Sequence, residues 1–563
     1  MVRRLARAAR HRVRTARLEP RVLRRELVEL VARECADRPD AHVVVVGEHR
    51  RALVRALRRR GPGWQVSATP ADPARRHVEL ALLPHADVVL AGADPAGDRL
   101  GDFRAVFFHT RPGGAFVVPR GAGELGAARG ALGEHLAEGW ATEPGPLRAG
   151  RVRKAWQNHR LAVRMHVTGE TLGDHFVLRH DLPDVMVKLD EPRGNAWIEG
   201  SAARHGTPHR VLSVLPAEQP PSAAVITEVP EPRRPPMGRP IKLADIALRE
   251  YRDVVVDVEQ LVVTGRVILP DTYRHNQAPT LTNFGVIDLP GPYGILQRPL
   301  PAPEDLPLLA GTHLHLDNEI RGHFGHTTTE VLSRMWSWPA ALEIDPDVRV
   351  LMTAARGRPE IAEWEYDFYE ACGIPRERIV KIDGPARVER LLSGTPMFSN
   401  PEYVHPRILE TWDRLGDVLA ARAEPRDDRP SRIFIARRIR KRACLNAEEV
   451  EEIFAARGFA IVYPEDYPLG EQVAMFRAAD VVAGYAGSGM FHIAFVTHPQ
   501  HVIQIGSDAY TPRNEVLMAA LRGHRIDAVV SRASKSTVQA EFAVDLDREG
   551  PHLLALLDRL PPA

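Results

Sequence analysis

One short stretch of the chain combines acidic side chains with imidazoles. Asp317 and Glu319 come first, and His326 and Glu330 follow at the spacing of one helical turn. If a helix begins near Gly325, His326 and Glu330 lie on one face of it. A carboxylate beside an imidazole selects its tautomer and raises its basicity, which suits a general base. A capped helix start with a histidine satisfied in the core is the alternative interpretation.

A strongly basic segment lies just before another predicted helix. It contains Arg437, Arg438 and Arg442, follows the apolar strand pattern of residues 432–436, and precedes Asn446, a natural N-cap. Ligands of open α/β sheets bind at the carboxyl ends of the strands. Guanidinium groups at that edge suit a diphosphate, because each can bind two oxygens. An exposed basic loop is the alternative interpretation.

A turn of small residues lies between a predicted strand and a predicted helix near residue 487. Gly487, Ser488 and Gly489 form its centre, with Ala486 before them and His492 shortly after. Backbone N–H groups at such a helix start bind phosphate oxygens well. Close packing of a helix on a strand requires the same small residues, so the turn alone does not distinguish the two interpretations.

Together these segments resemble glycosyltransferase family 61, the DUF563-type enzymes that include bacterial capsular polysaccharide transferases. The resemblance extends from about Thr312 to Ser507 and is densest after Ser431. His326 and Glu330 match the histidine of the family's asparagine-x-x-histidine helix start and the acidic residue four positions on, whereas the asparagine position is His323 here. The other matching residues are Arg442, Asn446, Gly458, Phe459, Ile461, Val462, Tyr463, Pro464, Glu465, Glu471, Gln472, Phe476, Ala478 and Ala479.

The resemblance implies a GT-B fold, in which two Rossmann-like lobes face each other across the active site. It also implies inverting transfer from a nucleotide sugar, commonly UDP-linked, to a glycan or lipid-linked glycan acceptor, as in capsular or cell-envelope polysaccharide synthesis. No metal or other cofactor is expected. His326, oriented by Glu330, would be the base, with Asp317 or Glu319 in reserve.

The donor site implied by the resemblance involves a larger set of residues that would contact the diphosphate, the ribose or the base. They are Arg437, Arg438, Arg442, Asn446, Glu471, Gln472, Gly487, Ser488, Gly489 and His492. The Gly-rich turn departs from the family pattern Gly-x-His-Gly-Ala-Gly-Leu-x-Asn, because Ala486 replaces the histidine and His492 the asparagine. The chain is therefore expected to compensate through His492 or Arg437, to use another donor, or to be a non-catalytic scaffold in glycan assembly.

The N-terminal part has its own α/β pattern. Strands are predicted at residues 42–47, 86–91, 105–108 and 113–118, with a helix at 51–60, which implies a parallel sheet. The last strand and its turn resemble class I methyltransferases. Gly47 is followed by Glu48, however, and not by their glycine-rich cofactor turn. We therefore predict a degenerate methyltransferase-like fold or an unrelated Rossmann-like unit; an S-adenosylmethionine-dependent methyltransferase is the rival activity.

The fold class predicted overall is α/β, a GT-B-like pair of Rossmann-like lobes plus an N-terminal Rossmann-like domain. The predicted regions are an Arg-rich helical leader (1–39), the Rossmann-like domain (40–150), an irregular or β connecting region with a Pro-rich linker (151–245), an acceptor lobe (246–425) and a nucleotide-sugar-binding lobe (426–563).

Composition narrows the class of protein. The 563 residues carry 75 basic and 73 acidic side chains, a net charge of +2 that gives no reason to expect a nucleic-acid partner. Three separated cysteines give no disulfide or zinc spacing, and no apolar run is long enough to span a membrane. We expect a cytoplasmic protein whose arginine-rich residues 1–25 either contact the anionic inner face of the membrane or form a solvated leader.

Overall fold

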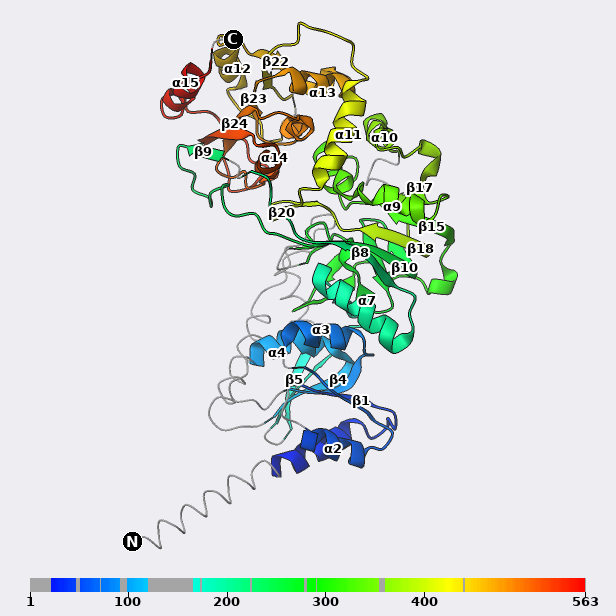
Figure 1. Ribbon diagram of the computed structural model, residues 1–563. Coiled ribbons are helices and arrows are strands. Elements are labelled where there is room, and N and C mark those ends of the chain that lie inside the picture. Colours follow the sequence, from blue (N-terminus) through cyan, green and yellow to red (C-terminus); the bar gives the residue numbers. More distant parts are fainter. Residues whose placement is uncertain are drawn as a thin grey trace, which may run out of the picture. The chain divides into compact units, whose positions relative to one another are not determined.

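The computed structural model describes residues 22–46, 51–70, 72–91, 99–119, 166–172, 175–222, 225–277, 281–289, 291–353, 360–438 and 441–561. The chain divides into two compact units (Figure 1). Unit 1 comprises Met1–His209, Val262–Thr272 and Thr280–Ala302, and unit 2 comprises Arg210–Leu261, Tyr273–Pro279 and Pro303–Ala563. Within the described ranges, no helix combines the length and the apolar character needed to cross a bilayer.

Unit 1 is built on a six-stranded sheet with the order β2-β1-β3-β4-β6-β5. The first four strands in this order are parallel, and β6 and β5 add to the edge as antiparallel strands. Its elements are β1 (His42–Val45), α2 (Arg51–Arg60), β2 (Gln65–Ala68), α3 (Pro73–Ala81), β3 (Ala86–Leu90), α4 (Arg99–Val106), η1 (Phe107–His109), β4 (Thr110–Val118), β5 (Val167–Leu172), β6 (His175–His180), β7 (Met186–Lys188), α7 (Glu191–His205), β11 (Leu261–Thr264), β12 (Val267–Ile268), η2 (Pro270–Thr272), β13 (Val286–Asp288) and β14 (Tyr293–Leu296).

Local sequence explains these elements of unit 1. Every residue of β1 and of β3 is buried, as expected for inner strands of a parallel sheet. In α2, Leu53, Val54 and Leu57 face the core at helical spacing. The helix of residues 22–34 contributes Leu27, Leu30 and Val31 to the same core. The part of the predicted leader at residues 1–21 lies outside the described residues.

The prediction of a strand at residues 105–108 of unit 1 is wrong. Residues 105–108 complete α4 and enter η1, whereas the predicted strands near 42, 86 and 113 correspond to β1, β3 and β4. A short, fully buried apolar run fits a strand or a buried helix equally well, which explains the error. Residues 47–50, where methyltransferases carry their cofactor turn, lie outside the described residues.

Unit 2 contains two lobes, whose strands belong to two different sheets. The first lobe orders its strands as β8-β10-β18-β15-β16-β17, antiparallel among the first three and parallel from β18 onward. Its elements are β8 (Arg210–Leu215), β10 (Ile246–Asp257), η3 (Pro303–Asp305), β15 (Leu308–His315), α8 (Phe324–His326), η4 (Thr327–Val331), η5 (Leu332–Arg334), α9 (Ser337–Ile344), β16 (Arg349–Thr353), α10 (Glu363–Ala371), η6 (Arg376–Arg378), β17 (Ile379–Ile382), β18 (Ala386–Gly394), β19 (Phe398–Ser399), β20 (Tyr403–Val404) and α11 (Ile408–Ala420).

The second lobe has an all-parallel sheet with the order β22-β21-β23-β24-β25-β9. This is the doubly wound arrangement in which ligands bind at the carboxyl edge of the strands. Its elements are β9 (Val225–Val229), β21 (Arg432–Ile435), α12 (Ala447–Ala455), β22 (Ala460–Val462), η7 (Pro464–Asp466), α13 (Leu469–Ala478), β23 (Val481–Tyr485), η8 (Ser488–Phe495), β24 (His501–Ser507), α14 (Asn514–Arg522), β25 (Arg525–Ser531) and α15 (Gly550–Asp558).

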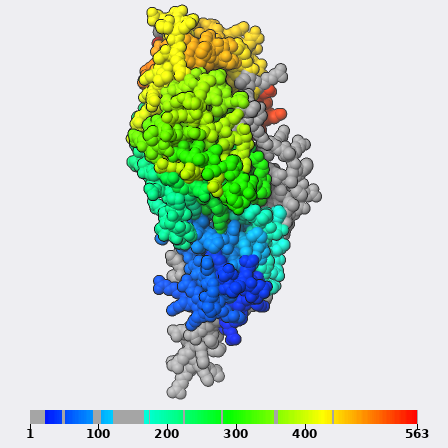
Figure 2. Space-filling model, turned by 90° about the vertical axis from the view of Figure 1, so that its right-hand side faces the viewer, coloured from blue at the N-terminus to red at the C-terminus, as the bar shows by residue number. Residues whose placement is uncertain are grey.

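The two lobes of unit 2 share a hydrophobic core. α11 contacts α10 and η5 of the first lobe and α13 and η8 of the second (Figure 1). Trp412 and Leu415 on α11 are fully buried in this core. In the space-filling view, the visible face of this unit is formed mainly by the green-to-yellow residues of the first lobe and α11 (Figure 2).

The predicted α/β class is confirmed, and its assignment to the GT-B type remains a prediction. The connecting region predicted at residues 151–245, with its Pro-rich linker, contributes β9 to the second lobe. β9 pairs with β25 in parallel, with Val225 opposite Arg525. The short sequence Val225–Val229 is flanked by prolines and polar residues, so its pattern did not reveal a strand that only a distant partner stabilises.

Candidate active site

The segment after β15 brings His326 and Glu330 into direct contact. The Nδ1 of His326 lies 2.7 Å from Oε1 of Glu330, and because an ionised carboxylate only accepts, Nδ1–H is the donor. No hydrogen bond to Nε2 of His326 is present among the described residues, and a quarter of the side chain is exposed. This ring nitrogen is therefore available to a substrate.

The helix that carries the pair is locally widened. Residues Thr327–Val331 form a π-helix, a conformation that often marks functional sites. The hydroxyls of Thr328 and Thr329 donate to the carbonyls of Phe324 and Gly325, which gives those carbonyls side-chain partners. The run of threonines thus provides a local, sequence-based reason for the irregular turn.

The carboxylate of Glu330 is also held by a cation, Arg274. Burial alone would raise the pKa of Glu330, but His326 and Arg274 lower it below its usual value. The Nε of Arg274 lies 3.3 Å from Oε1 of Glu330, and its Nη2 lies 2.8 Å from Nε2 of His275. Burial and the charge of Arg274 lower the pKa of His275 to about 4. Glu330 is thus kept ionised and able to orient His326.

The Gly-rich turn of the second lobe approaches two arginines closely. Gly487 has φ of 133°, and a Cβ at this position would lie 2.9 Å from Nη2 of Arg442 and 3.2 Å from Nη2 of Arg437. Its N–H donates to Oε1 of Glu515 at 2.8 Å. Only glycine satisfies both the backbone conformation and the lack of space.

The two arginines have different environments. Arg437 donates to the carbonyls of Arg442, Tyr485 and Ala486, and burial together with Arg442 lowers its pKa to about 10. The guanidinium of Arg442 lies 5.3 Å from the ring centre of Tyr510, and its buried Nε has no partner within the described part of the chain. Arg437 therefore holds the loop in place, whereas Arg442 is the cation available to an anionic ligand.

Segments of both lobes meet at this turn. A Cβ on Gly325 would lie 2.9 Å from the Cβ of Ser488. Burial, with the charges of His326, Lys441 and Arg442, lowers the pKa of His323 to about 4. His323 and His326 of the first lobe and the basic, glycine-rich turn of the second lobe therefore form one site.

His492 also connects the two lobes, in a buried position. Its ring stacks on Phe324 with ring centres 5.2 Å apart and contacts Phe476 at 5.0 Å. Only 1% of the residue is exposed, and burial lowers its pKa to about 4. His492 is thus a neutral residue that packs in the core between the two lobes.

The remaining predicted donor residues make other contacts. Arg438 forms two hydrogen bonds with Asp466 and lies over the ring of Tyr463. The side chain of Asn446 pairs with the backbone of Val544 through both its amide oxygen and its nitrogen.

Glu471 and Gln472, at the start of α13, have local partners. The carboxylate of Glu471 forms two hydrogen bonds with Arg429, at 3.0 and 2.9 Å. The amide nitrogen of Gln472 donates to the carbonyl of Tyr467 at 2.9 Å. A contact with the ribose or base would require these groups to exchange partners, and their role stays a prediction.

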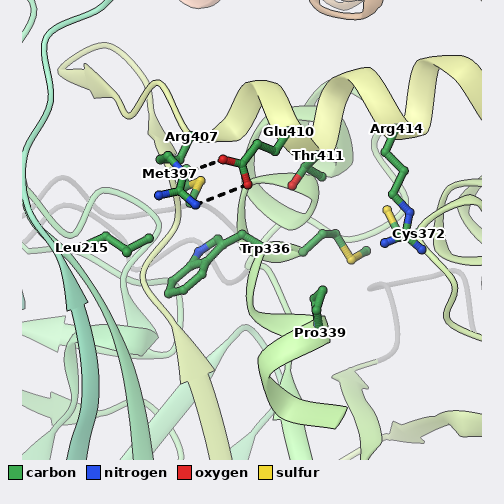
Figure 3. A pocket seen from close by; sticks show the side chains of 10 residues that line it. Leu215, Trp336, Pro339, Cys372, Met397, Arg407, Glu410, Thr411 and Arg414 are labelled. Carbon is green, nitrogen blue, oxygen red and sulfur yellow. Dashed lines mark hydrogen bonds and ion pairs between the residues drawn. The ribbon is translucent and has the colours of Figure 1, made fainter. Parts of the chain in front are cut away.

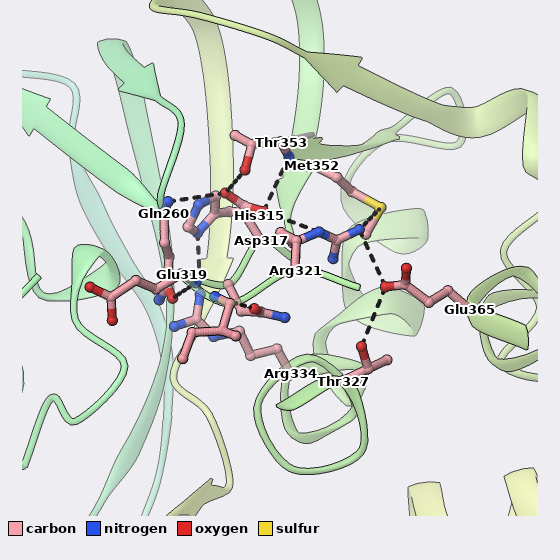
Figure 4. A network of polar contacts seen from close by, with 12 residues as sticks. Gln260, His315, Asp317, Glu319, Arg321, Thr327, Arg334, Met352, Thr353 and Glu365 are labelled. Carbon is pink, nitrogen blue, oxygen red and sulfur yellow. Dashed lines mark hydrogen bonds and ion pairs between the residues drawn. The ribbon is translucent and has the colours of Figure 1, made fainter. Parts of the chain in front are cut away.

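The predicted reserve base Asp317 belongs to a buried network at the end of β15 (Figure 4). Its carboxylate accepts from the backbone N–H of Gln260 and from both the N–H and the hydroxyl of Thr353. Arg321 lies 3.6 Å from Asp317 and 3.6 Å from Glu365. With these partners, Asp317 fixes the loop that leads to His326. Glu319 joins the network through its backbone N–H, which donates to Gln260.

Several residues near the site were not predicted from the sequence. Arg274 comes from a segment far from His326 in the chain, and Tyr510 and Glu515 come from the entry to α14. The hydroxyl of Tyr510 donates to Glu515, whose pKa burial raises. The described residues contain no cluster of three or more His, Cys, Asp or Glu side chains suited to a metal ion.

Two solved structures show a distant similarity to this chain. Two structures of the MycE methyltransferase from the mycinamycin biosynthetic pathway, one with Mg, SAH and mycinamycin VI and one with Mg and SAH, are 16% and 14% identical to this chain. The matches cover 28% and 31% of this chain and 46% and 52% of theirs, so the chain spans about half the length of these methyltransferases. Both have a TM-score of 0.21, which is too low to support a statement about fold.

Sequence comparison is more informative for the region of the site. No protein with a curated description is similar in sequence to this chain. Residues 324–503, from α8 with His326 through the Gly-rich turn into β24, match the family model described as Glycosyltransferase 61. This match confirms the resemblance found in the sequence.

Proposed function

We propose that unit 2 is an inverting glycosyltransferase that transfers a sugar from a nucleotide-sugar donor to a hydroxyl of a glycan acceptor. The observation that carries the proposal is the pairing of His326 with Glu330 beside the turn formed by Gly487 and Ser488 and the cation Arg442. Inversion requires one base for the acceptor and positive charge or N–H donors for the leaving diphosphate. The family match over residues 324–503 supports the same activity.

In the proposed reaction, Nε2 of His326 accepts the proton of the acceptor hydroxyl as its oxygen attacks the anomeric carbon. The bond from that carbon to the phosphate oxygen breaks, and its electron pair leaves with the nucleoside diphosphate. Glu330 stabilises the imidazolium that forms, because its carboxylate already accepts from Nδ1–H. Arg442 and Lys441 would neutralise the charge that develops on the diphosphate.

The donor is proposed to be UDP-linked, with no metal or other cofactor, and the acceptor to be a glycan or lipid-linked glycan of the cell envelope. The protein is proposed to act in the cytoplasm, with contact to the inner face of the membrane through residues 1–25. Ser488 and Gly489, at the start of η8, would present backbone N–H groups to the diphosphate.

The test uses the full chain with a panel of UDP, GDP and CMP sugars. A nucleotide present at about 100 times its dissociation constant should stabilise the protein by about 2.7 kcal/mol, which thermal unfolding detects. NMR of the transferred sugar then reports the configuration of the anomeric centre. Retention of configuration would exclude the inverting mechanism, and full transfer by His326→Ala would exclude the assigned base. Heat released with S-adenosylmethionine but with no nucleotide would favour the rival methyltransferase.

A further inference from the structure

A cavity of about 270 Å³ lies between the start of α11 and the segment that follows η5, away from the site described above (Figure 3). It is lined by Leu215, Met335, Trp336, Pro339, Cys372, Met397, Arg407, Glu410, Thr411 and Arg414. The volume is slightly below the roughly 300 Å³ at which pockets for drug-sized ligands begin. It is therefore suited to a single ring with its substituents.

One wall of the cavity is a polar face of α11. Arg407, Glu410, Thr411 and Arg414 recur at helical spacing, whereas the opposite face of α11 is buried in the core. Arg407 and Glu410 form an ion pair at 2.5 Å, and both are largely exposed, so the rim is open to solvent. This wall offers hydrogen-bond donors and acceptors side by side.

The opposite wall is aromatic and apolar. The indole N–H of Trp336 donates to the carbonyl of Thr395 at 2.9 Å, which fixes the ring in place. A Cβ on Gly394 would lie 3.2 Å from the Trp336 ring, so this glycine makes room for the indole. Met335 and Met397 complete the apolar surface. A rigid indole binds a ligand with little loss of conformational entropy.

Among the described residues, Arg414 is a cation of the cavity wall without an acidic partner. Within the part of the chain that the structure describes, its guanidinium donates no hydrogen bond to another residue, in contrast to Arg407. It lies near Gly373 and Cys372, where one of its nitrogens would be 3.0 Å from a Cβ on Gly373. A planar guanidinium at a pocket edge suits a carboxylate, which it can bind through two oxygens.

We propose that this cavity binds one pyranose unit that bears a carboxylate. The apolar face of the sugar ring would stack on Trp336, its hydroxyls would bond to Glu410 and Thr411, and its carboxylate would pair with Arg414. The binding chemistry follows from the lining residues; the assignment of the sugar to a glycan acceptor rests on the proposed function. Trp336 lies ten residues after His326, roughly 15 Å along a helix, so the bound unit would be remote from the reacting hydroxyl.

The experiment measures binding of methyl β-glucuronide and methyl β-glucoside to the full chain by calorimetry. The glucuronide is expected to bind at least about tenfold more tightly, because a hydrogen-bonded ion pair adds more than a neutral contact. Arg414→Gln should abolish this preference. Arg422→Gln is the matched control, because Arg422 pairs with Asp367 and does not line the cavity, and it should bind as the wild type does.

Fluorine NMR of protein labelled with 5-fluorotryptophan gives a second measurement. The resonance that Trp336→Phe removes should shift when the glucuronide binds. Binding of neither sugar, a preference that survives Arg414→Gln, or displacement of the glucuronide by UMP would overturn the proposal. His326→Ala should bind the glucuronide normally while losing transfer. Glucuronide binding by a chain that transfers no sugar would refute the proposed function and leave this inference standing.

Discussion

The Nδ1 of His326 lies 2.7 Å from Oε1 of Glu330, so the carboxylate determines which nitrogen of the imidazole faces a substrate. Arg274 contacts the same carboxylate oxygen and helps to keep Glu330 ionised. The base and its orienting group thus lie on one helical turn, with a third residue from a distant segment. Substitutions of His326 and of Glu330 are therefore expected to lower kcat by different factors.

His326→Ala is expected to lower kcat by about 10² to 10⁴-fold, the usual contribution of a general base, with little change in the KM of the donor. Glu330→Gln should lower kcat by a smaller factor, because the amide can still hold the ring but cannot stabilise its charged form. Steady-state kinetics of both variants checks this order. Equal losses in kcat for the two variants would contradict it, and Thr329→Ser serves as a neighbouring control.

Gly487→Ala is expected to weaken donor binding and to destabilise the protein by about 1–3 kcal/mol. The new Cβ would be forced into a left-handed conformation and against the guanidiniums of Arg442 and Arg437. Gly384→Ala is the matched control, because Gly384 lies outside the site and a Cβ there would meet no atom of the described residues within 4 Å. Nucleotide titration and thermal unfolding measure the two effects. A Gly487→Ala variant with wild-type binding would show that the turn does not contact the ligand.

Asp317→Asn is expected to reduce stability and to leave the activity of the folded fraction intact. The substitution removes a buried charge that pairs with Arg321 and accepts from Gln260 and Thr353. An uncompensated partner in such a network typically costs about 1–3 kcal/mol. Urea unfolding measures the loss, with Glu319→Gln as the control. A large fall in kcat at unchanged stability would instead support Asp317 as a base.

The sequence was sufficient to predict the elements that place the site. The apolar strand pattern at residues 432–436, which leads into the basic segment of the site, corresponds to β21, because buried parallel strands are continuous apolar stretches. The contact between His326 and Glu330 was also predictable, since it depends only on helical spacing.

Other parts of the site depend on tertiary structure alone. Arg274 approaches Glu330 from a short segment between two passages of the chain through unit 1, and no local pattern marks it. The sequence predicted that Arg437 and Arg438 contact phosphate. In the structure, Arg437 donates to backbone carbonyls and Arg438 donates to the carboxylate of Asp466. Residue type indicates that a guanidinium can bind an anion, but only the fold determines which partner is nearest.

Because several histidines are buried with lowered pKa values, we predict that the protein loses stability in mild acid. Burial lowers the pKa of His77 to about 4 and of His85 to about 3, and with Arg266 it places the pKa of His109 well below 6.5. The Nδ1 of His109 accepts from Arg266, a contact that a protonated ring cannot make. Below pH 6.5, these histidines therefore bind protons in the unfolded chain that they do not bind in the folded chain.

The free energy of unfolding should thus fall as the pH decreases from about 6.5 toward 4, by up to about 1.4 kcal/mol per pH unit for each such histidine. His275, His323, His492 and His524 of unit 2, whose pKa values are lowered to about 4, act in the same direction. Calorimetric unfolding between pH 7.5 and 5 measures the slope, and hydrogen exchange locates it in the chain. His77→Gln should reduce the slope, because it removes one group that takes up a proton only on unfolding. A melting temperature that stays constant over this range would contradict the argument.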